Sequence, residues 1–111
     1  MWVNENGWLT WLRYTIAEWM AAAENRRAKA RLRKIPDLWK MITGYRAESA
    51  VTGASWSDYW QLYCAVRRHR PKEVLEFGPG ISTVVLAYAL KENLRDGFGA
   101  GRLTCMEDVA A

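Results

Sequence analysis

The residues best suited to chemistry in this chain of 111 residues stand together in the stretch Glu76-Phe77-Gly78-Pro79-Gly80-Ile81-Ser82-Thr83. Glycine lacks a Cβ atom, so a ligand can approach the backbone closely, and glycine also adopts the positive φ angles that a sharp turn requires. The carboxylate of Glu76, two positions before the first glycine, would repel a pyrophosphate and attract an ammonium or sulfonium group. The stretch therefore indicates a binding site for a ligand that carries positive charge.

Two common nucleotide-binding loops do not fit this stretch. The nicotinamide and flavin fingerprint needs glycine at its first, third and sixth positions, and Thr83 occupies the sixth. The phosphate-binding Walker loop needs Gly-Lys-Ser or Gly-Lys-Thr, which does not follow here. An ordinary turn between a strand and a helix of an α/β domain remains the alternative to a ligand site.

The pattern around the turn predicts the elements that position it. It predicts, in order, a strand over 73–77, a turn over 78–80, a helix over 82–94, a flexible loop over 96–101 and a strand over 102–106. This order forms a βαβ unit, whose strands are parallel and whose crossover is right-handed. Ligands of open α/β sheets bind at the carboxyl ends of the strands, where the first amides of the helix are unpaired and carry partial positive charge. We therefore expect the ligand at the glycine turn.

The chain resembles the class I S-adenosylmethionine-dependent methyltransferases in two places. Their first motif, an acid and spaced small residues at the first strand-to-helix turn, is similar to VLEFGPGIST at 74–83. Their second landmark is an acid at the end of the next strand, and RLTCMED supplies Glu107 there, with Asp108 beside it. The resemblance covers about residues 57–111. It implies an α/β chain in which an N-terminal helical region, 1–56, precedes the opening βαβ part of a Rossmann-like methyltransferase domain, 57–111.

The resemblance also implies a cofactor, S-adenosylmethionine, and the residues that hold it. The implied cofactor-binding set is Glu76, Phe77, Gly78, Gly80, Ser82 and Glu107. In this set the two glycines let the turn pass beneath the cofactor, and Glu76 holds the methionine end directly or through water. The amide and hydroxyl of Ser82 help hold the methionine carboxylate, and Glu107 accepts hydrogen bonds from both ribose hydroxyls. The methyl acceptor and the catalytic residues stay unknown.

One departure from the family concerns the sheet. A class I methyltransferase has seven strands, whereas this sequence supplies the first two, so we expect a truncated chain that is inactive by itself. Methyl transfer depends largely on positioning two reactants, and an incomplete binding site positions neither well. A two-stranded sheet has two unpaired edges, so we also expect the isolated chain to be marginally stable, dimeric or prone to aggregation.

The N-terminal region is predicted to begin with an amphipathic helix rich in tryptophan. Its apolar residues recur at steps of three and four: Trp8, Leu12, Ile16, Trp19, Met20 and Ala23. Asn4 or Asn6 can cap this helix, and Pro36 stops it. We expect its Trp-rich face to lie in the core or against a partner, with a homodimer as the candidate assembly.

Two further helices are predicted before the first strand. The first covers 38–43 and ends at Gly44; after a loop over 45–54, the second starts at Ser55 or Ser57 and ends before Pro71. The second helix has an acid in its first turn and basic residues in its last, which agrees with the helix dipole. His69 lies in that basic end and receives no catalytic role.

Positive charge is concentrated between Arg26 and Lys34, where six of nine residues are basic. Their spacing spreads them around a helix, which favours a solvated face over a patch for nucleic acid or acidic lipid. Such a patch would make the chain a non-enzymatic helical module that binds nucleic acid or a protein. Another nucleotide-binding Rossmann protein is the second alternative, and Glu76 favours S-adenosylmethionine over NAD.

Composition sets broad limits on the class of protein. With 50% hydrophobic and 25% charged residues, the sequence is that of one ordinary globular domain and not of a disordered or disulfide-stapled chain. Cys64 and Cys105 lack metal-ligand spacing, so we expect free thiols and no metal. No N-terminal signal is recognised, which predicts a cytoplasmic protein. Arg13 and Glu18 interrupt the longest apolar stretch, so no membrane span is expected.

Overall fold

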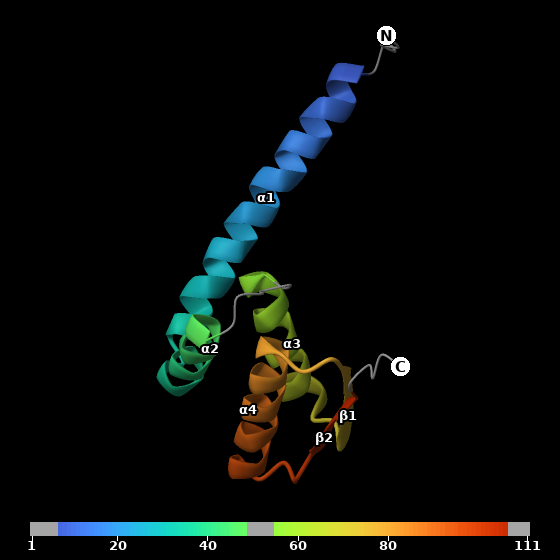
Figure 1. The fold of residues 1–111 in the computed structure, drawn as a ribbon. Helices are drawn as coiled ribbons and strands as arrows, with labels where there is room; N and C mark the ends of the chain where they lie inside the picture. The colour runs from blue at the N-terminus through green and yellow to red at the C-terminus, as the bar shows by residue number, and fades with distance from the viewer. Residues whose placement is uncertain (1–6, 49–54, 107–111) are drawn as a thin grey trace, which may run out of the picture.

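The computed structural model describes residues 7–48 and 55–106. Within these ranges the order of elements is α1 (Gly7–Arg33), α2 (Pro36–Glu48), α3 (Trp56–His69), β1 (Glu73–Phe77), α4 (Ile81–Arg95) and β2 (Arg102–Met106). Figure 1 shows α1 as a long helix that extends well beyond the other elements, which gather near its C-terminal end. The described part is therefore a mixed structure of helices and strands, as expected for an α/β chain.

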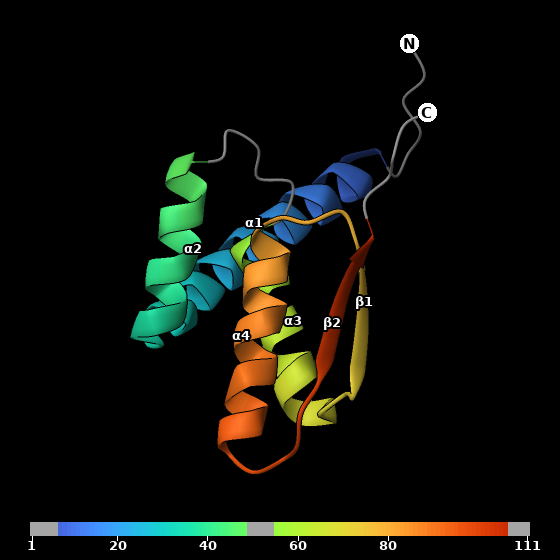
Figure 2. The ribbon, with the colours of Figure 1, turned by 60° about the horizontal axis from the view of Figure 1, so that its bottom comes forward.

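The two strands form a parallel sheet, and α4 connects them. The register pairs Glu73 with Arg102 and Phe77 with Met106, so both strands end at the same level. This confirms the predicted parallel β-α-β order and the bounds of both strands. Figure 2 shows the sheet lying beside α4 and α3.

Two clusters of buried side chains form the core. The first draws on all four described helices: Leu32, Leu38, Ile42, Tyr59, Ile81 and Val85. The second lies between α3, α4 and the sheet: Val66, Leu86, Ala89 and Leu90, with Val74 and Leu103 packed against them. Because the first cluster joins residues from both sides of the predicted boundary at residue 56, the N-terminal helices and the βαβ unit are packed on a shared core.

Helix α3 has well-defined ends that fix its position before the sheet. The Asp58 amide donates to Ser55 Oγ at 3.3 Å, and the Ser55 amide donates to Asp58 Oδ2 at 3.0 Å, which is a capping box. At the other end Arg70 adopts a left-handed conformation, and its amide donates to Val66 O at 2.9 Å. Of the two predicted caps, Ser55 is therefore the one that caps the helix, and the predicted end before Pro71 is confirmed.

The prediction for the second helix was wrong in its extent. We expected a helix over 38–43 that ends at Gly44, and α2 instead runs from Pro36 to Glu48 through that glycine. Glycine inside a helix costs only about 1 kcal/mol relative to alanine. Packing of Leu38 and Ile42 in the core offsets such a cost. Of the predicted loop over 45–54, the first four residues are helical and the others lie outside the described ranges.

The N-terminal part of α1 does not pack in the core, contrary to one of our two expectations for its Trp-rich face. Trp8, Trp11 and Trp19 are 65%, 67% and 70% exposed. The buried residues of α1 are Ala28 and Leu32, which lie in its last two turns. The homodimer that we expected as the alternative stays a prediction. The candidate caps Asn4 and Asn6 lie outside the described residues.

Candidate functional site

The glycine turn lies at the carboxyl ends of both strands. Gly78 has a φ of +83°, a left-handed conformation that favours glycine. Its amide donates to Met106 O at 2.8 Å, so the turn is attached to the last residue of β2. A Cβ atom added at Gly78 or Gly80 would meet no atom within 4 Å. The backbone of the turn is therefore open to a ligand, as the sequence predicted.

Glu76 lies beneath the turn and accepts hydrogen bonds from three side chains. It is 9% exposed, because the alternation of β1 directs it toward α4. Its Oε1 accepts a short hydrogen bond from the Ser82 hydroxyl, and its Oε2 accepts from Thr83 Oγ1 at 2.6 Å and from Cys105 Sγ at 3.5 Å. The carboxylate is thus fixed in orientation by the start of α4 and by the neighbouring strand.

Thr83 connects this carboxylate to the turn itself. Its hydroxyl accepts a hydrogen bond from the Gly80 amide at 2.9 Å while it donates to Glu76. The same side chain therefore caps the start of α4 and fixes Gly80 relative to the end of β1. From the sequence, Thr83 was recognised as the residue that breaks the dinucleotide fingerprint and as the last residue of the 74–83 motif, but no role was assigned to it; its hydroxyl at the first turn of a helix was the missed signal.

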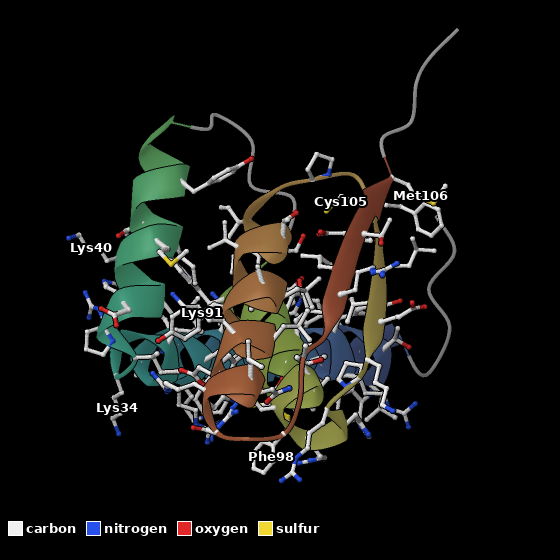
Figure 3. All side chains as sticks on the ribbon, turned by 90° about the horizontal axis from the view of Figure 1, so that it is seen from below. Lys34, Lys40, Lys91, Phe98, Cys105 and Met106 are labelled. Carbon is white, nitrogen blue, oxygen red and sulfur yellow. The ribbon has the colours of Figure 1, made fainter. Side chains whose placement is uncertain are left out.

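Cys105 is the second residue at this site whose role was not predicted from the sequence. It is paired with Glu76 in the register of the sheet, so its side chain leaves β2 on the same face. Figure 3 shows Cys105 and the adjacent Met106 on opposite sides of β2. The signal was present in the two predicted strands, since Glu76 and Cys105 are each the fourth residue of their strand. To use this signal, the register between the two strands has to be known.

The predicted cofactor-binding set divides into three groups. Glu76, Gly78, Gly80 and Ser82 lie together at the turn. The Phe77 side chain is 77% exposed and, by the alternation of β1, leaves the sheet on the face opposite Glu76. Glu107 lies outside the described residues, as does Asp108, so its predicted place at the end of β2 stays a prediction.

A second polar cluster joins α3 to α4 away from the turn. Arg67 donates to Asn93 Oδ1 at 2.8 Å and to Asp96 Oδ2 at 2.5 Å, and it lies 3.3 Å from the Glu92 carboxylate. Tyr63 donates to Glu92 Oε2 at 2.5 Å. Burial, and after it this hydrogen bond, raises the pKa of Tyr63 well above its usual value. The buried Glu92 and Asn93 are thus paired with the partly exposed Arg67 and Tyr63, and the cluster holds the two helices together.

Half of the basic run packs against aromatic rings within the chain. Lys29 Nζ lies 5.6 Å from the centre of the Trp56 ring, and the guanidinium groups of Arg31 and Arg33 lie 5.9 Å and 5.3 Å from the rings of Trp60 and Trp39. Cation–π contacts at these distances are favourable. The C-terminal part of α1 therefore uses three cations to hold α2 and α3. Arg26 and Arg27 of α1 and Lys34 of the turn after it are exposed.

Two clefts that the described residues line lie away from the turn. One of about 330 Å³ lies between α1 and α3 and includes Arg27 and Trp60 in its lining, and another of about 260 Å³ lies between α2 and α4 beside Met41 and Tyr88. Among residues 7–48 and 55–106, no group of three His, Cys, Asp or Glu side chains is arranged to hold a metal ion. Burial raises the pKa of the free Cys64 thiol, which makes it a weak nucleophile.

Comparison with known proteins gives no further assignment. No protein-family model, no curated protein and no solved structure matches this chain. The geometry of the turn and the chemistry of its residues are therefore the basis for any functional assignment.

Proposed function

We propose that this chain is the cofactor-binding N-terminal part of an S-adenosylmethionine-dependent methyltransferase with a Rossmann-like fold. The observation that carries the proposal is the open glycine turn at the carboxyl ends of two parallel strands, with a fixed carboxylate beneath it. Ligands of α/β sheets bind in this position. In this proposal β1, α4 and β2 are the opening unit of the sheet, and the methyl acceptor is not identified.

The charge at the turn supports a cofactor that carries a cation. A carboxylate offers about four lone-pair sites, and Glu76 accepts three hydrogen bonds from Ser82, Thr83 and Cys105. Its Oε1 accepts only the Ser82 bond of these three, so that oxygen can accept one more, from an ammonium group or from a bridging water. The pyrophosphate of NAD would be repelled by the same carboxylate.

The start of α4 is suited to bind a negatively charged group of the same ligand. The first amides of a helix have no partner within the helix, and together with the helix dipole they attract a carboxylate. An amino acid moiety carries both an ammonium and a carboxylate group, so a turn with Glu76 on one side and the start of α4 on the other fits it. When bound, S-adenosylmethionine supplies an electrophilic methyl group on its sulfonium; the residues of this chain bind and orient it.

The proposal is tested by calorimetric titration of the chain with S-adenosylhomocysteine, and with NAD as the competing ligand. We expect heat of binding with a Kd of about 1 mM or tighter for S-adenosylhomocysteine. Gly80→Ala should weaken this binding at least about tenfold, because its Cβ would occupy the open space above the turn. The φ of −177° at Gly80 is extended backbone that alanine adopts, so the variant should fold.

Gly44→Ala in α2 is the matched control. A Cβ atom there also meets nothing within 4 Å, and the position lies in α2 and not in the turn, so binding should be unchanged. The absence of heat at millimolar S-adenosylhomocysteine would contradict the proposal. Tighter binding of NAD than of S-adenosylhomocysteine would instead favour another nucleotide-binding Rossmann protein.

A further inference from the structure

The exposed side of α1 carries one continuous stripe of side chains with two chemical parts. Trp8, Leu12, Ile16 and Trp19 form its apolar part, and Arg26, with Lys34 in the turn that follows α1, forms its basic part just beyond. At about 100° per residue the five positions within α1 fall within a sector of about 80° on a helix. All six are exposed. We call this set the outer stripe.

The outer stripe faces away from the rest of the molecule. Ala28 and Leu32, which are buried against the core, lie on the opposite side of the same helix by the same periodicity. Figure 1 shows that the other elements lie around the C-terminal end of α1 and leave its N-terminal part extended. Figure 3 shows the Lys34 side chain at the edge of the molecule. The N-terminal part of the stripe is therefore open to a flat partner.

The charge and shape of the stripe fit one class of partner. The acids of α1, Glu18 and Glu24, lie off the stripe by the helical periodicity, so the stripe carries cations only. Tryptophan has an apolar body and a polar N–H, which places it preferentially at the boundary between lipid chains and water. Lysine and arginine beside such residues are attracted to anionic headgroups. Within the described residues no helix is both long and apolar enough to cross a bilayer.

We propose that the outer stripe binds the surface of an anionic lipid bilayer, with α1 lying parallel to it. The apolar part enters the headgroup boundary, and Arg26 and Lys34 contact anionic headgroups. Nucleic acid would engage the basic part and leave Trp8 and Trp19 in water. In a parallel pair of two copies, the Arg26 side chains of both helices would face each other. A bilayer accepts both parts of the stripe from one side.

The test is sedimentation of the full chain with vesicles of phosphatidylcholine, either pure or with roughly one phosphatidylglycerol in three lipids. The chain should bind the anionic vesicles more tightly, with a blue shift of its tryptophan fluorescence. Trp19→Ser should weaken binding about tenfold through loss of buried apolar area. Arg26→Gln should weaken it about fivefold on anionic vesicles and much less on neutral ones.

Tyr14→Ser and Lys40→Gln are the matched controls. Tyr14 is as exposed as Trp19 but lies on the other side of α1, and Lys40 is an exposed cation on α2. Both variants should bind the vesicles within about twofold of the unchanged chain. Absence of binding to anionic vesicles, or equal losses in Tyr14→Ser and Trp19→Ser, would overturn the proposal. A stable dimer that Trp19→Ser converts to monomer would assign the stripe to a second copy instead. Binding of duplex DNA that depends on Arg26 but not on Trp19 would assign it to nucleic acid.

Discussion

Replacement of Gly101 by alanine should destabilise the fold, although this glycine is remote from the turn. Gly101 directly precedes β2, and a Cβ atom added there would lie 2.5 Å from Leu90 Cδ2 and 2.9 Å from Pro71 O. Ordinary contacts between carbon atoms are about 3.5–4.0 Å. Leu90 is buried in the cluster beneath the sheet, so its movement would disturb the core, and the Pro71 oxygen is a backbone atom that moves only with the segment that leads into β1.

The size of the effect follows from this geometry. Additional methyl groups in a well-packed core cost about 1–3 kcal/mol of unfolding free energy. In a domain of this size each kcal/mol lowers the melting temperature by roughly 4–8 °C. We therefore expect Gly101→Ala to melt about 5–20 °C below the unchanged chain.

Thermal unfolding followed by circular dichroism measures this loss. Gly80→Ala is the control, because a Cβ atom at Gly80 meets nothing within 4 Å and its extended backbone suits alanine. A second measurement compares the loss of stability that Gly101→Ala causes in the Leu90→Ala background with the loss that it causes in the unchanged chain. Removing Leu90 Cδ2 leaves the contact with the Pro71 oxygen, so the added cost of Gly101→Ala should fall but not vanish.

Two results would refute the reasoning. If Gly101→Ala melted within about 1 °C of the unchanged chain, the close approach of Leu90 and Pro71 would not exist in solution. If the substitution cost as much in the Leu90→Ala background as in the unchanged chain, Leu90 would not be the neighbour that resists the added methyl group.

Two further predictions concern α3. Ser55→Ala should lower the unfolding free energy, measured in urea, by about 1 kcal/mol through loss of the cap to Asp58. Ser57→Ala, which leaves that cap intact, should lower it less. Equal losses would contradict the capping role of Ser55. The pKa of Tyr63 is raised by burial and by its hydrogen bond to Glu92, so the folded chain keeps a proton that the unfolded chain releases near pH 10. This contribution to stability is complete below that pH and is lost as the pH rises further. The unfolding free energy should therefore fall less steeply above about pH 10 in Tyr63→Phe than in the unchanged chain, and parallel curves would show that the Tyr63 proton does not contribute.

The parts of the fold that were predicted correctly are those with strong local signals. Both strands and the glycine turn were bounded by glycine, proline and short apolar runs, and the structure confirms them. The start of α3 was predicted from Ser55 or Ser57 followed by Asp58, and the choice of Ser55 needed the actual hydrogen bonds. The extent of α2 was wrong because a local rule, termination at Gly44, was outweighed by packing of the helix on the core.

Part of the candidate site was predictable because its signals are also local in the sequence. Glu76, Gly78 and Gly80 were recognised because their types and spacing suffice to indicate a turn with a carboxylate. Thr83 and Cys105 were missed because their roles depend on a hydroxyl that reaches back to the strand and on the register between two strands. That register brings together residues almost thirty positions apart, which no local pattern specifies.

The sequence by itself determined the type and order of the elements around the turn, since helical and strand periodicity, caps and turn residues act between near neighbours in the chain. The tertiary structure alone decided which faces are buried. The apolar positions of α1 have the spacing of a core helix, yet Trp8 and Trp19 lie in solvent, while three cations of the same helix pack on aromatic rings. Burial depends on which elements meet in space, and the periodicity of a helix states only which side chains share a face.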